Sequence, residues 1–331
     1  MRSLVVMIVV MFLSCLVANA RIAYTLSVKG AMAKSLLKVV DQDGVPVSDA
    51  KVWGAFSANR LKDSVLVDGV TDMNGEFVVQ GNCNEFLRID VTKEGYYHTE
   101  EKINFRQSKS DPIVVDGKWQ PYGEKRMVVL KKICTPSHLI FSESKCSEIP
   151  VFDTWVGYDI EKGDWVAPHG KGVLPDMQLR FITVCNEGDV FCRTMEVSFT
   201  NCLYAGAYMM SRDKNSEFDT VYHADTNAHF QTYFKYEFNH SKNKIIRNEL
   251  SQEQYLVFRV RVKVDEKGDV TSAHYGKLMG NWKFFECNNM CIGRRFFNPT
   301  PNDTNLEDIQ AANRSRDFIR LCEPPPKSKR K

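Results

Sequence analysis

The sequence lacks the short motifs by which many enzyme classes are identified. It contains no Gly-x-Ser-x-Gly nucleophile elbow, no His-Glu-x-x-His helix and no glycine-rich loop that could cradle phosphate. Paired Cys-x-x-Cys units, which are common ligands of structural zinc, are also missing. These absences lead us to predict no catalytic residue, no metal and no cofactor, and to favour a role other than catalysis.

A large excess of charge of one sign is missing too. The 331 residues include 44 Lys and Arg against 41 Asp and Glu, which leaves a net charge of +3. This excess is too small to indicate a nucleic-acid-binding protein. Only the C-terminal end concentrates basic residues, in a run typical of a solvated tail: Lys327, Lys329, Arg330 and Lys331. The length is sufficient for about two domains.

Long apolar runs are absent except at the start of the chain. Arg2 precedes an apolar run from Leu4 to Leu13, and the small residues of Ala18-Asn19-Ala20 follow. This order is typical of a secretory signal peptide, so residues 1–20 are predicted to be removed after Ala20. The alternative is a lipoprotein signal in which Cys15 becomes the acylated N-terminus. Either way the chain is exported, to the periplasm, the cell surface or the medium, and no other candidate membrane segment occurs.

Cysteines are plentiful, and export to an oxidising compartment favours disulfides among them. Nine of the ten cysteines remain after cleavage at Ala20. Cys185 and Cys192 flank a predicted hairpin with a Gly-Asp turn, so they should lie opposite one another. Cys134 with Cys146 is a second candidate pair. Because nine is odd, at least one thiol is expected to be free or to bond to another molecule.

The first half of the chain shows no sustained helical period. Short runs of alternating apolar residues are separated by turn signals about every ten residues, which predicts a β-sandwich or barrel. The clearest turn is that of Asp72, Asn74 and Gly75. Asn74-Gly75 can supply the positive φ of a tight hairpin turn, and Asp72 can accept hydrogen bonds from the amides of the turn. The sequence therefore predicts an all-β fold with a structural turn at this position.

Three segments, in order, resemble the carboxypeptidase regulatory-like domains. They are Val45–Val52, Thr71–Phe77 and Lys93–Tyr96, and they match patterns that recur in that family. The resemblance covers residues 33–133. It implies a transthyretin-like β-sandwich that is not catalytic and is appended to enzymes, surface proteins or transporters. It supplies no catalytic residue.

The second half of the chain is also rich in predicted strands. Residues 230–238 and 255–264 alternate cleanly between apolar and polar side chains, which is typical of half-buried antiparallel strands. We predict an antiparallel β-rich domain of unknown role over residues 134–300. A tail over residues 301–331 follows, with a weak helical pattern and the basic end. This half resembles only exported bacterial proteins without an assigned role.

Aromatic residues cluster in one turn-rich part of the second half. Trp155, Tyr158 and Trp165 could present flat faces on which sugar rings stack, because binding residues are often carried on loops of a rigid scaffold. The alternative, which we favour, is that these side chains fill the core.

A basic stripe runs along one predicted strand. Arg259, Arg261 and Lys263 alternate with apolar residues, so their side chains should share one face. That face could meet an acidic glycan. The alternative is an ordinary solvated strand face or one paired across strands.

The acidic residues of the second half are densest close to these aromatics. Asp153, Asp159, Glu161, Asp164 and Asp176 occur among turn residues. A pair of carboxylates could perform acid–base chemistry on a glycosidic bond. We favour the interpretation that these acids organise turns, since aspartate is common at loop positions.

Taken together, these patterns favour a monomeric, exported, non-catalytic binding or structural protein with a glycan or a surface protein as its partner. The alternative is a secreted hydrolase of polysaccharide or peptide. Its site would lie in the second domain, around Asp159–His169.

Overall fold

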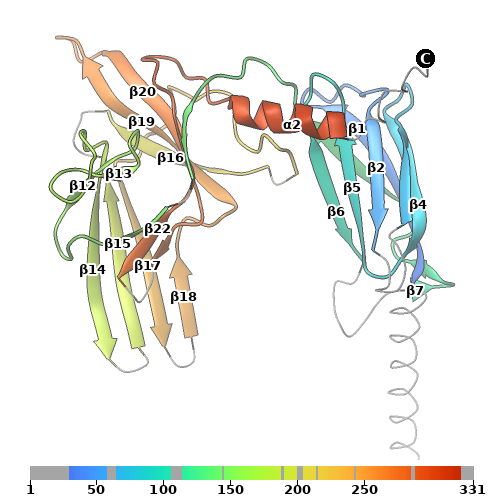
Figure 1. The fold of residues 1–331 in the computed structure, drawn as a ribbon, viewed down its shortest axis with the longest axis horizontal. Helices are drawn as coiled ribbons and strands as arrows, with labels where there is room; N and C mark the ends of the chain where they lie inside the picture. The colour runs from blue at the N-terminus through green and yellow to red at the C-terminus, as the bar shows by residue number, and fades with distance from the viewer. Residues whose placement is uncertain are drawn as a thin grey trace, which may run out of the picture. The chain divides into compact units, whose positions relative to one another are not determined.

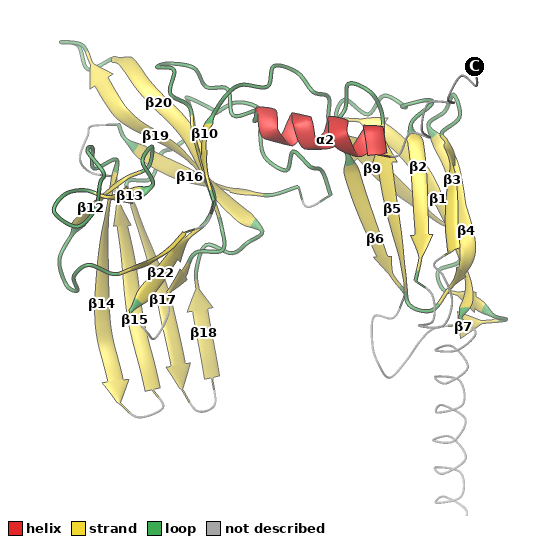
Figure 2. Ribbon diagram, in the orientation of Figure 1, coloured by secondary structure: helices red, strands yellow, loops and turns green. Residues whose placement is uncertain are grey.

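The computed structural model describes residues 30–57, 65–105, 114–143, 145–187, 190–199, 204–213, 215–241, 244–284 and 288–321. Regular structure in these ranges is almost entirely β, with one helix near the C-terminus (Figures 1 and 2). The predicted all-β class is confirmed. The predicted signal peptide lies outside the described residues. No helix in these ranges is both long and apolar enough to cross a membrane.

The chain divides into two compact units, each with an apolar core of its own. The first unit comprises Met1–Ile133, Asn215–Glu217 and Asn313–Lys331, and the second comprises Cys134–Lys214 and Phe218–Ala312. Two short pieces from late in the sequence therefore complete the first unit. Neither is expected there from the sequence, because both are distant along the chain.

The first unit is a β-sandwich of two sheets around one core. The five-stranded sheet contains β4 (Glu76–Cys83), β1 (Ala31–Asp41), β8 (Lys118–Trp119), β7 (Val114–Val115) and β9 (Glu124–Leu130). The four-stranded sheet contains β3 (Val65–Val70), β2 (Lys51–Phe56), β5 (Phe86–Thr92) and β6 (Thr99–Asn104). Strand β1 is central to its sheet, antiparallel to β4 and parallel to β8 and β9.

Alternation along β1 shows how the sequence builds this core. Ala33, Leu37 and Val39 are buried, whereas Lys34 and Lys38 between them are only partly buried. Side chains of successive strand residues point to opposite faces, so one face of β1 is apolar except for the buried Ser35. The result is a core that includes residues of both sheets.

The turn at residues 72–75 has the hydrogen bonds that its sequence predicts. Gly75 has φ of +72°, and Asp72 Oδ1 accepts hydrogen bonds from the amides of Asn74 (2.9 Å) and Glu76 (2.7 Å). The turn does not close a hairpin, however, because the strands that it joins, β3 and β4, belong to different sheets. It is a corner of the sandwich. A Cβ atom at Gly75 would overlap the carbonyl oxygen of Val39, so the corner is also tightly packed.

The second unit contains three sheets that contribute to a second apolar core. The six-stranded sheet contains β13 (Asp164–Trp165), β12 (Val156–Asp159), β14 (Met177–Glu187), β15 (Val190–Ser198), β17 (Tyr233–Ser241) and β18 (Lys244–Asn248). The five-stranded sheet contains β10 (Ile140–Ser142), β23 (Arg295–Phe297), β20 (Val270–Met279), β19 (Gln254–Val264) and β16 (Gly206–Ser211). The three-stranded sheet contains β11 (Lys145–Glu148), β22 (Asn289–Ile292) and β21 (Lys283–Phe284).

A disulfide joins two neighbouring strands of the smallest sheet. Cys146 on β11 is bonded to Cys291 on β22, its register partner, 145 residues away in the sequence. The expected pair of Cys134 with Cys146 is therefore not formed. Spacing in the sequence favoured Cys134 as the partner of Cys146, because it is nearer. The pairing of β11 with β22 instead places the distant Cys291 opposite Cys146.

The hairpin predicted between Cys185 and Cys192 is present. The two residues face one another in the register of β14 and β15, as the sequence predicts. They are not bonded, because Cys192 carries a free thiol.

The helix predicted in the tail is α2, which spans Ile309–Leu321. Asp308 precedes it, and its Oδ1 atom accepts a hydrogen bond from the amide of Gln310 (3.1 Å), which is the behaviour of an N-cap residue. Within the first unit, Ser315 Oγ accepts a hydrogen bond from the amide of His98 (3.1 Å), and the Phe318 ring stacks on the His98 ring at 3.9 Å. These contacts attach the later turns of α2 to the first unit.

Candidate functional site

The acidic stretch of the second unit folds as a short hairpin and the loop that follows it. Strands β12 and β13 are joined by a turn in which the carbonyl of Asp159 accepts a hydrogen bond from the amide of Gly163 (2.8 Å). Asp159 Oδ1 accepts a hydrogen bond from the amide of Lys162 (2.9 Å), and Oδ2 accepts two, from Val173 (2.9 Å) and Leu174 (3.1 Å). The Asp159 side chain is 1% exposed. It therefore holds the two parts of the loop together.

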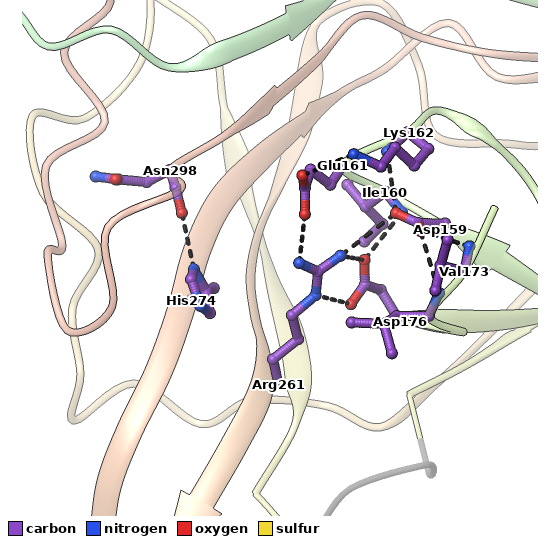
Figure 3. Close-up of polar contacts among 10 residues, drawn as sticks. Asp159, Ile160, Glu161, Lys162, Val173, Asp176, Arg261, His274 and Asn298 are labelled. Carbon is purple, nitrogen blue, oxygen red and sulfur yellow. Dashed lines mark hydrogen bonds and ion pairs between the residues drawn. The ribbon is translucent and has the colours of Figure 1, made fainter.

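Arg261 reaches this loop from β19. The register of β19 and β20 shifts between Val260 and Lys263, and Arg261 has φ of +53°, which marks a β-bulge. Its guanidinium donates to Asp176 through Nε (2.8 Å) and Nη2 (3.0 Å), and to Glu161 through Nη1. Asp159 Oδ1 lies 3.4 Å from Nη2. Figure 3 shows the guanidinium between the carboxylates of Asp176 and Glu161.

We call Asp159, Glu161, Asp176 and Arg261 the arginine–carboxylate cluster. Burial tends to raise the pKa of Asp159, but the amides that donate to it, with Arg261, hold that pKa below its ordinary value. Hydrogen bonding to Arg261 lowers the pKa of Glu161. Burial raises the pKa of Asp176, and the hydrogen bonds from Arg261 offset this only in part.

The geometry of the cluster suits a brace better than an acid–base pair. A raised pKa is what a general acid needs, and Asp176 has one. Both of its oxygens are engaged, however, since Oδ1 accepts from Arg261 and Oδ2 accepts from Arg261 and the amide of Ile160. Its side chain is also 1% exposed, so a substrate cannot reach it without disrupting the cluster.

The remaining acids of the stretch also lie in a bend or next to a turn. Asp164 Oδ1 and Oδ2 accept hydrogen bonds from the amides of Trp165 (2.9 Å) and Lys171 (3.1 Å). Asp153 has φ of +60° in a bend, a conformation that aspartate tolerates better than most residues. Within the described residues, no group of three or more His, Cys, Asp and Glu side chains is arranged to hold a metal ion.

The three aromatic residues that the sequence offers as a stacking platform do not lie together on the surface. Tyr158 and Trp165 are register partners on β12 and β13, and their rings meet edge to face at 5.3 Å in the core. They are 3% and 4% exposed. These two residues therefore lie in the core, as the favoured interpretation of the sequence has it, and they form no platform, because strand alternation points both inward. Trp155 alone is partly exposed.

The basic stripe is not an open surface either. Arg259 donates to the carbonyl of Tyr204 (2.9 Å), and its guanidinium lies over the Phe230 ring at 4.0 Å. Arg261 belongs to the arginine–carboxylate cluster, and Lys263 is exposed. The bulge directs the Arg261 side chain to the carboxylates, and Arg259 is held by the Tyr204 carbonyl and the Phe230 ring. The three side chains therefore do not act as one basic surface for an acidic glycan.

A different set of polar and aromatic residues lies on the outer face of the six-stranded sheet, away from the core. Arg180 on β14 and Glu196 on β15 are register partners, and Tyr233 is on β17. Glu196 Oε2 accepts a hydrogen bond from Arg180 Nε (2.6 Å), and Oε1 accepts one from the Tyr233 hydroxyl (2.6 Å). The Arg180 guanidinium lies 4.9 Å from the centre of the Trp155 ring. We call Trp155, Arg180, Glu196 and Tyr233 the outer-face row.

The outer-face row combines a well-held charge pair with accessible rings. Glu196 is 7% exposed, and Tyr233 is 47% exposed. Burial tends to raise the pKa of Glu196, but the hydrogen bonds from Tyr233 and Arg180 hold that pKa below its ordinary value. Desolvation and the hydrogen bond to Glu196 raise the pKa of Tyr233 to about 12, so its hydroxyl stays a donor at neutral pH. Only Trp155 was singled out from the sequence, because the other three are assembled by cross-strand register.

Comparison with known proteins assigns no family. No family model matches the chain, and no curated protein matches it. Among solved structures, 3-chlorocatechol 1,2-dioxygenase from Rhodococcus opacus is similar over 31% of this chain and 61% of its own length, with 16% identity and a TM-score of 0.25. Catechol 1,2-dioxygenase from Acinetobacter radioresistens is similar over 32% of this chain and 53% of its own, with 17% identity and a TM-score of 0.25. The chain thus spans less than two thirds of these dioxygenases.

A pilin gives broader but equally weak similarity. The major pilin subunit of Bacillus cereus is similar over 84% of this chain and 100% of its own, with 12% identity and a TM-score of 0.22. Likeness at this level assigns neither a fold family nor an activity to the chain.

Proposed function

We propose that this chain is an exported, monomeric, non-catalytic protein that binds a glycan on the outer-face row of its second unit. The observation that carries the proposal is the position of Glu196, whose two oxygens hold Arg180 and Tyr233 on one sheet face. The first unit is, in this proposal, a carboxypeptidase regulatory-like sandwich with a structural role. The disulfide between Cys146 and Cys291 is compatible with an oxidising compartment.

The dimensions of the row fit a short oligosaccharide. Trp155 precedes β12, and the row crosses β14 and β15 to reach Tyr233 on β17. Three spacings of roughly 4.8 Å between neighbouring strands give a length of about 14 Å. The partly exposed ring of Trp155 and the exposed ring of Tyr233, at the two ends, could stack on sugar faces. The Arg180–Glu196 pair between them offers charged groups for hydrogen bonds with sugar hydroxyls.

The side chains of the outer-face row are preorganised, which favours affinity for a ligand. Side chains that are already held lose little conformational freedom when a ligand arrives. Arg180 and Tyr233 are fixed by Glu196, and Trp155 is fixed by Arg180. Aromatic and arginine side chains are also those that most often dominate binding energy.

A non-catalytic role is supported by the hydrogen bonds and ion pairs that occupy the carboxylates of the arginine–carboxylate cluster. The acids that a hydrolase would need in this region are bound to Arg261 and to backbone amides, and they organise a loop. A carboxylate occupied in this way is poorly placed to donate a proton to a leaving group.

The test is equilibrium binding of the mature chain to defined polysaccharides, for example hyaluronan, pectin and a neutral glucan, by isothermal titration calorimetry. For a polysaccharide that binds, Trp155→Ala and Tyr233→Ala are each expected to weaken binding by about 1–3 kcal/mol, by analogy with base stacking on aromatic side chains. Trp53→Ala is the matched control, because Trp53 is 41% exposed on the first unit. Equal affinity for all variants, or a loss with Trp53→Ala alone, would contradict the proposal.

A further inference from the structure

The five-stranded sheet of the first unit presents four lysines on its outer face. Lys34 and Lys38 occupy alternate positions of β1, between buried residues, so their side chains point away from the core. Lys118 of β8 and Lys125 of β9 are register partners of outward-facing residues of β1, so they join the same face. The sheet therefore gathers positive charge from three strands on one surface.

Little negative charge on this face compensates the lysines. Among the strand residues of the face that the structure describes, only Glu76 of β4 is acidic, and its carboxylate lies 3.8 Å from Lys38 Nζ. Lys34 and Lys125 form no ion pair with a described residue. Four lysines against one glutamate leave an excess of three positive charges.

The outer face of the four-stranded sheet shows the opposite arrangement. Arg88 of β5 lies 3.0 Å from a carboxylate oxygen of Asp90 and 2.9 Å from one of Glu100, which is on the neighbouring β6. Charges on that sheet are therefore balanced by their own neighbours. The positive charge of the five-stranded sheet is not balanced in this way, so it is complementary to an acidic partner.

Two exposed apolar side chains lie among the lysines. Val78 of β4 is 47% exposed, and Met127 of β9, the register partner of Lys38, is 70% exposed. An acidic polysaccharide offers carboxylates and hydroxyls to the lysines but little to aliphatic side chains. The boundary between the headgroups and the acyl chains of a bilayer offers both negative charge and apolar contact. We give the name lysine face to this set: Lys34, Lys38, Val78, Lys118, Lys125 and Met127.

We propose that the lysine face docks the first unit on a membrane surface that contains anionic phospholipid. Each lysine close to such a surface strengthens binding by about fivefold. Met127 and Val78 add apolar contact at the headgroup boundary, which favours a lipid surface over a purely ionic partner. The attachment is peripheral and reversible, and it is independent of the outer-face row, which belongs to the second unit.

The test is sedimentation of the mature chain with vesicles of phosphatidylcholine, with and without phosphatidylglycerol. The chain is expected to sediment with the vesicles that contain phosphatidylglycerol and to stay in the supernatant with phosphatidylcholine alone. Binding should weaken as salt is raised from about 0.1 M to about 1 M, because the screening length falls from about 10 Å to about 3 Å. Absence of binding that depends on phosphatidylglycerol would overturn the proposal.

Two double variants separate the lysine face from a general effect of net charge. Lys34→Gln with Lys125→Gln should weaken binding by about twentyfold, as the product of two lysines. Lys51→Gln with Lys102→Gln removes the same charge from exposed positions on the outer face of the four-stranded sheet, and this variant should bind nearly as well as wild type. Equal losses in the two double variants would overturn the proposal.

A third variant and a second ligand test the choice of a lipid surface. Met127→Ser, which leaves the charge unchanged, should weaken binding to phosphatidylglycerol vesicles and keep its salt dependence. Unchanged binding by Met127→Ser would contradict a contact with the headgroup boundary. Pectin in solution provides negative charge without a bilayer. Binding of pectin that is lost in the Lys34→Gln, Lys125→Gln variant, with no binding to vesicles, would replace the membrane by an acidic glycan.

Discussion

Arg261 and Asp176 form a two-pronged ion pair, with Nε 2.8 Å from Oδ1 and Nη2 3.0 Å from Oδ2. The two residues are far apart in the sequence, and the pair joins β19 to the loop that precedes β14. A β-bulge at Arg261 directs the side chain to this position. Acids that could suggest a catalytic site from the sequence therefore have a structural role, because they bind Arg261.

Replacing Arg261 by Gln should destabilise the second unit. The buried carboxylates of Asp159 and Asp176 would lose their counter-charge, and breaking a buried pair by removing one partner costs about 3–5 kcal/mol. Urea denaturation at pH 7 measures the change. Lys263→Gln, at an exposed neighbouring position, should change stability by less than about 0.5 kcal/mol. Equal stability of the two variants would show that the cluster is not a brace.

The cluster also predicts how stability depends on pH. The pKa values of Asp159 and Glu161 are lowered by folding, so their contribution is present above their ordinary values of 3.8 and 4.5 and is lost as the pH falls through the folded values. The raised pKa of Asp176 acts in the opposite direction and offsets part of this loss. Wild type should lose stability below about pH 4.

The Arg261→Gln variant should show a smaller loss in acid. Without the guanidinium, protonation of these carboxylates relieves an unpaired charge instead of breaking an ion pair. The difference in unfolding free energy between wild type and variant should therefore shrink from pH 7 to pH 3. A difference that stays constant over this range would exclude coupling between Arg261 and the carboxylates.

Gly75→Ala tests the corner of the first unit. The new Cβ would sit at positive φ and overlap the carbonyl oxygen of Val39, so we expect a loss of roughly 1–3 kcal/mol. Gly44→Ala is the control, because Gly44 has φ of +79° but a Cβ atom there would meet no other atom within 4 Å. In thermal melts, the Tm of Gly75→Ala should be lower than that of Gly44→Ala. The reverse order would mean that the packing at Val39 is unimportant.

Removing the disulfide should weaken the second unit. The bond closes a loop of 145 residues, and loss of a bond of this kind typically costs about 2–5 kcal/mol. Cys146→Ser and Cys291→Ser should therefore lower the unfolding midpoint to a similar extent. Cys192→Ser should have little effect, since Cys192 is not bonded. Mass spectrometry of the unreduced protein that found Cys146 joined to another cysteine would contradict the assignment.

Local patterns in the sequence predicted the features that depend on local geometry. The turn at Asp72 and Gly75, the hairpin that places Cys185 opposite Cys192, and the helix after Asp308 all depend on residues a few positions apart. The all-β class follows from alternation, which is also local.

Long-range pairing is what the sequence could not supply. Cys291 is opposite Cys146 only because β22 pairs with β11, and Glu196 meets Arg180 only through the register of β14 and β15. The prediction that the basic stripe forms one surface was wrong for a related reason, because strict alternation along the strand does not anticipate the bulge at Arg261. Candidate sites chosen by proximity in the sequence were therefore the least secure part of the prediction.

The central claim is that the ligand is bound on the outer-face row and not at the acidic loop. Hydrogen–deuterium exchange of the mature chain, with and without a polysaccharide that binds, tests it most directly. We expect added protection in the peptides that contain Trp155, Arg180 and Tyr233, and unchanged exchange in the loop from Gly163 to Asp176. Protection confined to that loop would contradict the claim and favour the hydrolase alternative.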